Sequence, residues 1–208
     1  MQASKIGPGT PERKYKMENM TLIVPCYNEE EVLPFFYEEF QKVAKRLEAY
    51  RTEVIFVDDG SRDRTLEVIK KLAEEDERVK YISFSRNFGK EAAIYAGFQH
   101  ADGDYIAMLD ADLQDPPSLL PEMMKGIVEE GYDSVATRRV SRKGEPPVRS
   151  FFARCFYKLM KKISTAEIMD GARDFRLMTR QFKDAILEMS EYNRFSKGIF
   201  GWVGFKTK

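Results

Sequence analysis

The chain has one histidine, His100, and two cysteines, Cys26 and Cys155, among its 208 residues. So little histidine argues against a histidine-rich metal site and against a catalytic triad that depends on an imidazole base. The cysteines lie far apart in the sequence and lack the spacing of metal ligands, which favours reduced thiols and a cytosolic setting.

Long apolar runs and an excess of one charge are also missing. No stretch free of Asp, Glu, Lys and Arg exceeds ten residues, so these residues contain neither the apolar core of a signal peptide nor a membrane span. Lys plus Arg and Asp plus Glu number 34 each, so net charge points to no class of partner and gives no sign of nucleic-acid binding. The composition, 43% hydrophobic and 33% charged, is typical of a globular domain.

Apolar runs alternate with helix-like stretches along most of the chain. Residues 1–16 are polar and without periodicity, and we expect a flexible arm there. Predicted strands at 20–25, 53–59, 79–85 and 104–110 alternate with predicted helices at 29–50, 65–73 and 90–101. This order is typical of parallel βαβ units. The sequence therefore predicts an α/β fold with a Rossmann-like, mostly parallel sheet and helices on both faces.

Polar clusters follow all four predicted strands, at 25–29, 58–61, 85–90 and 110–114. Parallel sheets bind ligands beyond the carboxyl ends of their strands, so these clusters should share one rim. Taken singly, Ser61 and Asp63 are explained equally well as helix caps. Four clusters in succession, two of them acidic, are harder to explain in that way.

The stretch MLDADLQDPP places Asp110 and Asp112 two residues apart after an apolar strand. In an extended segment both carboxylates would point the same way and repel each other unless a cation lay between them. Mg²⁺ or Mn²⁺ suits a site of one or two carboxylates completed by water and substrate phosphates. Gln114 could add a neutral oxygen. The pattern predicts a divalent metal that holds a diphosphate.

Four stretches, in this order and spacing, resemble a known family: IVPCYNEEE, EVIFVDDGSRDRT, SRNFGKEAAIYAGF and YIAMLDADLQDPP. They are similar to the nucleotide-sugar domain of family 2 glycosyltransferases with the GT-A fold. More narrowly, NFGKEAA, DADLQDPP and DFRLM resemble polyprenol-phosphate glycosyltransferases, such as bactoprenol glucosyltransferases and dolichol-phosphate mannose synthases. The resemblance implies a nucleotide-sugar donor, a divalent metal, a lipid-phosphate acceptor and inversion at the anomeric carbon.

The resemblance also implies roles for individual residues. Those expected at the nucleotide are Pro25, Tyr27, Glu29, Asp58, Lys90 and Asp110, with Asp58 at the nucleobase. Those expected at the metal are Asp110, Asp112 and Gln114. Asp110, Asp174 and Arg138 are the expected catalytic residues. Asp174 would lie at the acceptor side, either as a base or as a group that orients the sugar or an arginine such as Arg176.

Two features depart from the family pattern. Related enzymes continue into amphipathic and membrane-spanning helices, whereas this sequence ends at GWVGFKTK, so we expect a truncated chain whose full-length form is membrane-anchored. Arg173 stands where small residues are common, which leaves the acceptor geometry open. The remainder, 17–208, is expected to be one catalytic domain.

Residues 137–165 are rich in Arg and Lys and are expected to face the acceptor or the membrane. Arginine forks suit phosphate, and an anionic bilayer would attract such a segment. The arginines expected at the acceptor phosphate or membrane are Arg138, Arg142, Arg149 and Arg154. An ordinary amphipathic helix packed on the sheet explains the helical part of the segment equally well.

The sequence thus predicts an inverting transferase that moves a hexose from a UDP-sugar to undecaprenyl phosphate at the cytoplasmic face of the cell membrane. GDP-mannose with dolichol phosphate, or a saccharide acceptor, is the alternative. A receiver domain would carry its paired aspartates after the first strand, and a nucleotidyltransferase would need a Gly-rich loop there. A membrane-binding module without catalysis and a homo-oligomer both stay open.

Overall fold

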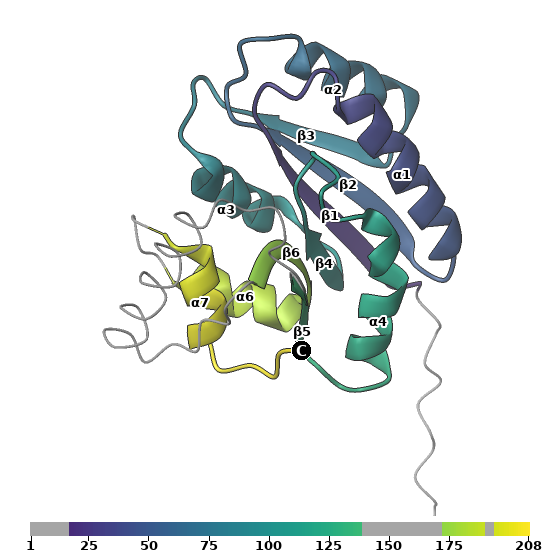
Figure 1. Ribbon diagram of the computed structural model, residues 1–208, viewed down its shortest axis with the longest axis vertical. Coiled ribbons are helices and arrows are strands. Elements are labelled where there is room, and N and C mark those ends of the chain that lie inside the picture. The colour runs from purple at the N-terminus through teal and green to yellow at the C-terminus, as the bar shows by residue number, and fades with distance from the viewer. Residues whose placement is uncertain (1–16, 139–171, 190–193) are drawn as a thin grey trace, which may run out of the picture.

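The computed structural model describes residues 17–138, 172–189 and 194–208. The helices and strands follow one another along the chain as shown in Figure 1. In order they are β1 (Asn19–Cys26), α1 (Leu33–Arg46), β2 (Arg51–Asp58), α2 (Thr65–Glu75), β3 (Val79–Ser83), α3 (Lys90–His100), β4 (Tyr105–Met108), the 3-10 turn η1 (Pro117–Leu119), α4 (Leu120–Val128), β5 (Ser134–Arg138), β6 (Ala172–Thr179), α6 (Arg180–Glu188) and α7 (Ser196–Trp202).

The strands form one sheet in the order β3-β2-β1-β4-β6-β5. The pairs β1–β2, β1–β4 and β2–β3 are parallel, whereas β6 runs antiparallel to both of its neighbours. Five strands therefore share one direction, and the predicted mostly parallel sheet is confirmed. Strands β1 to β4 lie where strands were predicted from the sequence, whereas β5 and β6 were not predicted.

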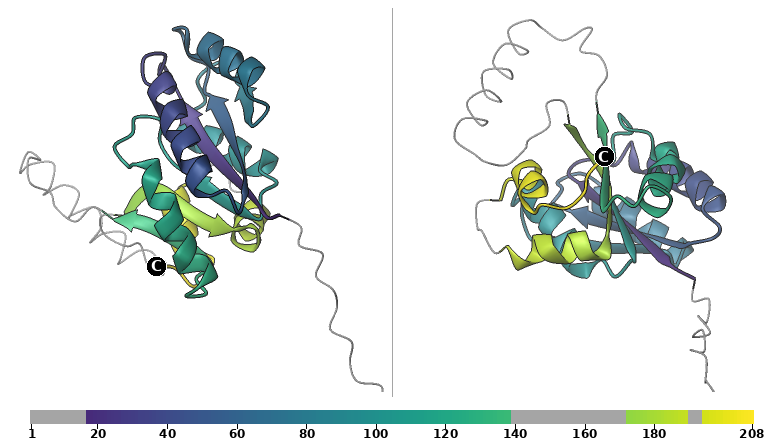
Figure 2. Two further views of the ribbon diagram at one scale, coloured as in Figure 1. Left: turned by 90° about the vertical axis from the view of Figure 1, so that its right-hand side faces the viewer. Right: turned by 90° about the horizontal axis from the view of Figure 1, so that it is seen from below.

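Alternate residues of the central strands face opposite sides of the sheet. Leu22 and Val24 belong to one buried cluster, which also contains apolar residues of α1, α2 and α4. Ile23 belongs to a second cluster, shared with α3, α6 and α7. A strand buried on both faces needs apolar residues at successive positions, as the run LIV provides. Helices cover both faces, as predicted (Figures 1 and 2).

Helix α3 lies directly against β1 because Gly97 has no side chain. A Cβ atom at Gly97 would lie 2.2 Å from Cγ2 of Ile23, far inside van der Waals contact. The close approach fixes the helix on the sheet. It also fixes Lys90, the first residue of α3, at the edge where the parallel strands end.

The loop before α1 is tied to the loop after β2. The N–H of Asn28 donates to Oγ of Ser61 at 3.0 Å, and the N–H of Glu29 donates to Oγ1 of Thr65 at 2.7 Å. These bonds hold residues 28 and 29 outside the helix, so α1 begins later than expected. Asp63 accepts the N–H of Thr65, the first residue of α2, at 3.0 Å. Asp63 thus accepts a free N–H group at the start of α2, but the N-cap position itself is Arg64, whose side chain forms no capping bond.

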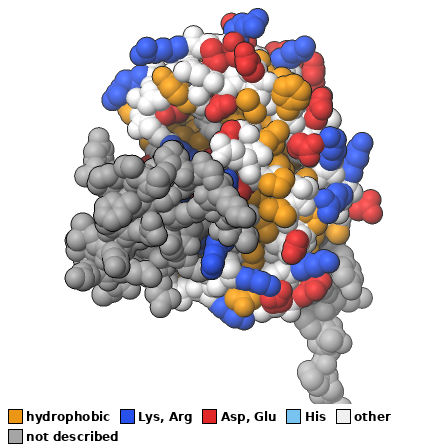
Figure 3. Space-filling model, viewed as in Figure 1, with side chains coloured by type: hydrophobic (Ala, Val, Ile, Leu, Met, Phe, Trp, Pro, Cys, Tyr) orange, Lys and Arg blue, Asp and Glu red, His pale blue; other side chains and the backbone are white. Residues whose placement is uncertain are grey.

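The described surface carries mixed charge. In the face shown in Figure 3, acidic and basic side chains alternate around the margin, and neither sign dominates. Over the three described ranges, no helix is both long enough and apolar enough to cross a membrane.

Candidate active site

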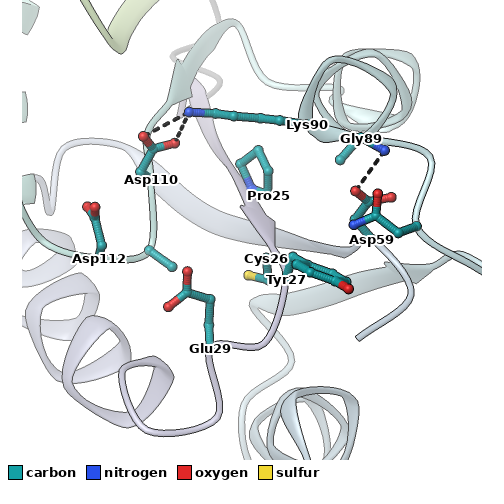
Figure 4. A pocket seen from close by; sticks show the side chains of 12 residues that line it. Pro25, Cys26, Tyr27, Glu29, Asp59, Gly89, Lys90, Asp110 and Asp112 are labelled. Carbon is teal, nitrogen blue, oxygen red and sulfur yellow. Dashed lines mark hydrogen bonds and ion pairs between the residues drawn. The ribbon is translucent and has the colours of Figure 1, made fainter. Parts of the chain in front are cut away.

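A cavity of about 310 Å³ lies at the edge of the sheet where β1, β2 and β4 end. Its lining residues are Pro25, Cys26, Tyr27, Glu29, Asp59, Asn87, Gly89, Lys90, Ala93, Asp110, Ala111 and Asp112. Among the residues labelled in Figure 4, Pro25, Cys26, Tyr27 and Glu29 lie at or after the end of β1, Asp59 follows β2, Asp110 and Asp112 follow β4, and Lys90 reaches toward Asp110 from the start of α3. The expectation that the polar clusters share one rim is therefore confirmed.

Asp110 and Asp112 both line the cavity, but not on an extended segment. Strand β4 ends at Met108, and the two carboxylates lie in the turn that follows. Leu113 has a φ of +56°, a left-handed conformation that costs a non-glycine residue about 1–2 kcal/mol. From β6, Arg173 donates through Nη1 to Oδ2 of Asp115 at 3.1 Å and so ties down the far side of the turn. The departure noted at Arg173 thus has a structural role.

Gln114 makes a different contribution from the one expected. Its backbone N–H donates to Oδ1 of Asp112 at 3.1 Å, which orients that carboxylate. Its side chain is exposed and does not line the cavity. A direct bond from Gln114 to a metal remains a prediction.

The acidic rim raises the pKa of its own neighbours. Burial raises the pKa of Glu29, and the charges of Asp112, Asp110 and Asp63 raise it further. Burial likewise raises the pKa of the Cys26 thiol well above its ordinary value, with Glu29, Asp58 and Asp110 adding to the effect. Glu29, Asp59, Asp110 and Asp112 line the cavity together with a single cation, Lys90, and carboxylates gathered in this way favour a bound cation.

Lys90 connects the cavity to a carboxylate outside its lining. Its Nζ lies 2.7 Å from Oδ1 of Asp110 and 2.5 Å from Oδ2 of Asp174. Lys197, on α7, contacts the other oxygen of Asp174, with Nζ 3.1 Å from Oδ1. Because β6 is antiparallel, its first residues reach the same rim as the carboxyl end of β4, which is how Asp174 comes to lie beside Asp110.

The two lysines stabilise the ionised form of Asp174. Burial opposes ionisation, but the hydrogen bond and charge of Lys90, together with Lys197, lower the pKa of Asp174 below its ordinary value. For Lys90, burial also opposes the charge, and the bonds to Asp110 and Asp174 raise its pKa above the usual range. A carboxylate with a lowered pKa is a weak base, but its charge can hold the two lysines in position.

Asp58 and Asp59 hold loops at the edge of the cavity through hydrogen bonds. Asp58 is buried and does not line the cavity; it accepts hydrogen bonds from the N–H of Ser61 at 3.1 Å and the hydroxyl of Ser83 at 3.0 Å. Asp59 accepts the N–H groups of Phe88 at 2.7 Å and Gly89 at 2.9 Å. The predicted contact of Asp58 with a nucleobase stays a prediction.

Only some of the residues expected at the acceptor lie in the described parts of the chain. Arg138 ends β5, is exposed and does not line the cavity. Arg142, Arg149 and Arg154 lie outside the described residues. Arg176, considered as a partner of Asp174, is buried; its Nη1 donates to Oγ of Ser134 at 2.8 Å, and its guanidinium lies over the ring of Phe200. Lys90 and Lys197 contact Asp174 in its place.

Seven residues at or beside the site were not among the predicted site residues: Cys26, Asp59, Asn87, Gly89, Ala93, Ala111 and Lys197. Asp59 and Asn87 lie within the predicted strand-end clusters, so their positions in the sequence could have indicated a role at the site. No feature of the sequence indicated Lys197, because its contact with Asp174 depends on how α7 packs.

Comparison with known proteins agrees with this geometry. The family model described as Glycosyl transferase family 2 matches residues 21–187. The chain is 49% identical over 189 residues to the putative glycosyltransferase CsbB of Bacillus subtilis, covering 91% of this chain and 56% of that protein. It is 43% identical to a prophage bactoprenol glucosyl transferase homolog of Escherichia coli, covering 90% of this chain and 61% of that protein.

A solved structure supports the fold. The mannosyltransferase PcManGT from Pyrobaculum calidifontis, in complex with GDP-Man and Mn²⁺, superposes with a TM-score of 0.60 at 20% identity, covering 93% of this chain and 55% of that one. The present chain thus spans little more than half of these proteins. With a family match over most of its length, a close curated relative and this sheet, the chain belongs to the family 2 glycosyltransferases and has the GT-A fold.

Proposed function

We propose that this chain is the catalytic domain of an inverting glycosyltransferase that moves a hexose from a UDP-sugar to a polyprenyl phosphate such as undecaprenyl phosphate. The observation that carries the proposal is the acidic cavity at the strand ends, with Lys90 joining its Asp110 to Asp174. The relatives named as bactoprenol glucosyl transferases support the acceptor class.

The donor set of the cavity fits a divalent cation. Within the described parts of the chain, no group of three or more His, Cys, Asp or Glu side chains forms a metal site. Two carboxylates, Asp110 and Asp112, in a negative pocket suit Mg²⁺ or Mn²⁺, which take their remaining ligands from water and phosphate. Such an ion would neutralise the diphosphate that departs with the nucleotide.

The remaining residues of the cavity would hold the donor. Pro25, Tyr27 and Glu29 provide a wall for the base and ribose, and Tyr27 is 39% exposed, so its ring is open to stacking. Lys90 reaches from this wall toward Asp174 and would lie beside the transferred sugar or the diphosphate.

The chemistry needs no strong base on the protein. A phosphate monoester has a second pKa near 6, so the acceptor oxygen already carries charge at neutral pH. That oxygen would form a bond to the anomeric carbon while the bond from this carbon to the β-phosphate oxygen breaks and its electron pair leaves with UDP. Attack opposite the leaving group inverts the centre. Asp174, with its lowered pKa, would position the lysines and the sugar.

A lipid acceptor would place the transfer reaction at a membrane surface. Arg138 at the end of β5 is exposed toward solvent, and Arg142, Arg149 and Arg154 follow it in the sequence. We expect them to contact anionic lipid or the acceptor phosphate. Each Arg or Lys engaged near the surface would add about 1 kcal/mol to the free energy of membrane binding. The cytoplasmic membrane face is the expected location, and membrane anchoring is expected of the whole protein.

A thermal-shift panel with a transfer assay tests the proposal. The chain is titrated with UDP-glucose, UDP-N-acetylglucosamine and GDP-mannose, each with Mn²⁺ and with EDTA. Transfer of labelled sugar to farnesyl phosphate in detergent follows, and NMR defines the anomer of the product. We expect metal-dependent stabilisation by a UDP-sugar and an inverted product. Stabilisation by GDP-mannose alone would favour the alternative donor, which the GDP-Man complex of the structural neighbour suggests.

A further inference from the structure

Lys197 lies at the transfer site although neither the donor cavity nor the family match includes it. Its Nζ is 3.1 Å from Oδ1 of Asp174, and its side chain is 31% exposed. The family model ends at residue 187, before α7 begins. The lysine therefore belongs to a part of the chain whose role the family membership leaves open.

Asp174 separates two cations. Lys90 approaches its Oδ2 from the donor cavity, which Lys90 lines, and Lys197 approaches its Oδ1 from α7, outside the cavity lining. A group transfer between two phosphates needs positive charge on both sides of the moving sugar, because both the attacking and the leaving oxygens are anionic. Lys90 and the metal site supply charge on the donor side. Lys197 is placed to supply it on the other side.

Contacts with two neighbouring helices hold α7 in this position. Glu91, next to Lys90 on α3, accepts the N–H of Ser196 at 3.1 Å and also its hydroxyl. Arg194 donates to the carbonyl oxygens of Ile186 and Met189 at the end of α6, and its guanidinium lies 4.5 Å from the ring centroid of Tyr95. Successive residues of α3 and α7 are thus paired: Lys90 with Lys197 through Asp174, and Glu91 with Ser196. The arrangement fixes the distance between the two lysines.

We propose that Lys197 binds the phosphate group of the acceptor, and that Asp174 and Glu91 are positioning residues that hold it there. The proposal rests on the proposed transfer to a phosphate acceptor and names the residue that would recognise that phosphate. It places a binding residue for the acceptor on α7, in addition to the basic residues expected at the acceptor from the sequence.

Steady-state kinetics of Lys197→Gln, with farnesyl phosphate in detergent as acceptor, test the proposal. Removing a charge-assisted bond to phosphate should raise the KM for the acceptor about tenfold or more. The affinity for UDP with Mn²⁺, measured by calorimetry without acceptor, should stay within about twofold. Lys197→Arg should restore most of the acceptor affinity, because it keeps the charge. Lys42→Gln is the matched control, since Lys42 forms a surface pair with Glu39 at 2.7 Å on the distant helix α1.

A second variant tests the positioning role. Glu91→Ala should also raise the KM for the acceptor while UDP affinity is kept, and Glu91→Asp should recover part of the loss. An unchanged acceptor KM in Lys197→Gln would overturn the assignment of Lys197. An equal loss of UDP affinity would also overturn it, because Lys197 would then serve the donor. If the unmodified chain binds UDP-sugar but transfers nothing to prenyl phosphates, the proposed function fails and this inference falls with it.

Discussion

One ammonium group joins Asp110 and Asp174: Nζ of Lys90 lies 2.7 Å from Oδ1 of Asp110 and 2.5 Å from Oδ2 of Asp174. The antiparallel register sets Met108 beside Arg176, so the end of β4 and the start of β6 lie side by side. Two carboxylates that share one site repel each other, and the ammonium group of Lys90 between them offsets the repulsion. The same lysine therefore links the predicted metal-binding aspartate to the aspartate of the acceptor side.

Removing Asp112 should abolish tight binding of UDP with Mn²⁺. The diphosphate would then meet the negative rim formed by Asp110 and Glu29 without a well-held cation. Calorimetry of Asp112→Ala with Mn²⁺ and with EDTA measures the effect, and we expect at least a tenfold loss with Mn²⁺. Asp184→Ala, at a largely exposed aspartate of α6, is the control. An unmodified chain whose UDP affinity is the same in EDTA would contradict the metal assignment.

Replacing Asp174 by Asn should lower turnover by a constant factor at every pH. The pKa of Asp174 lies below its ordinary value, so the carboxylate stays ionised throughout the usual assay range. The loss of turnover on removing this carboxylate should therefore not change with pH in that range. We expect a loss of roughly 10- to 100-fold, the scale of removing charged hydrogen bonds. The pH–rate profile of the variant is the measurement. Recovery of activity as pH rises past about 6, where the acceptor phosphate ionises, would instead show that Asp174 is a base.

An alanine at position 60 should damage both stability and donor binding. Gly60 has a φ of +66°, and a Cβ there would lie 2.3 Å from the backbone carbon of Arg86, just before the loop that Asp59 holds. Gly131 has nearly the same φ, +67°, with no atom within 4 Å of its would-be Cβ. Gly131→Ala should therefore cost about 1 kcal/mol and Gly60→Ala roughly 1–3 kcal/mol more. Urea unfolding of both variants separates the energetic cost of the clash from the cost of a left-handed alanine, which both variants share. Equal losses in the free energy of unfolding would exclude the clash.

Asp76 should contribute a pH-dependent share of stability. Its pKa is lowered to about 2, chiefly by hydrogen bonds from Arg78, with a further bond from Tyr37. Because the folded pKa lies below the unfolded value, the stabilisation is present above about pH 4 and declines as pH falls toward 2. Allowing for partial exposure, the contribution is about 1–2 kcal/mol. The stability difference between the chain and Asp76→Asn, from urea unfolding, should shrink by about half between pH 7 and pH 3. A constant difference would exclude the linkage.

The cavity, where we propose that the donor binds, could be predicted from the sequence because it follows local rules. Alternation of strands and helices places Tyr27, Lys90 and Asp110 at one edge of a parallel sheet, and all three line the cavity. The turn at Asp112 was less predictable: a left-handed Leu113 is a state that local preference disfavours, and its contact with the core stabilises it.

The contacts of Asp174, where we propose that the acceptor binds, could not be predicted in the same way. The contact between Lys90 and Asp174 joins residues 84 apart, and it depends on the antiparallel direction of β6. Lys197 reaches Asp174 from α7, and one of the contacts that hold the start of this helix, between Glu91 and Ser196, spans 105 residues. No periodicity in the sequence encodes such pairings, although the resemblance to the family did indicate Asp174.

The cavity draws all of its lining from residues 25–112, whereas Asp174 and Lys197 come from beyond residue 171. On the function proposed above, residues for the donor and residues for the acceptor are encoded in consecutive portions of the gene, with α4 and β5 between them. On that proposal, a crossover in α4 would exchange the acceptor while keeping the nucleotide sugar, provided that the incoming portion keeps a carboxylate within reach of Lys90. The incoming portion would also have to keep the other contacts that cross the joint, which include the β4–β6 pairing, the bond from Arg173 to Asp115 and the bonds from Ser196 to Glu91.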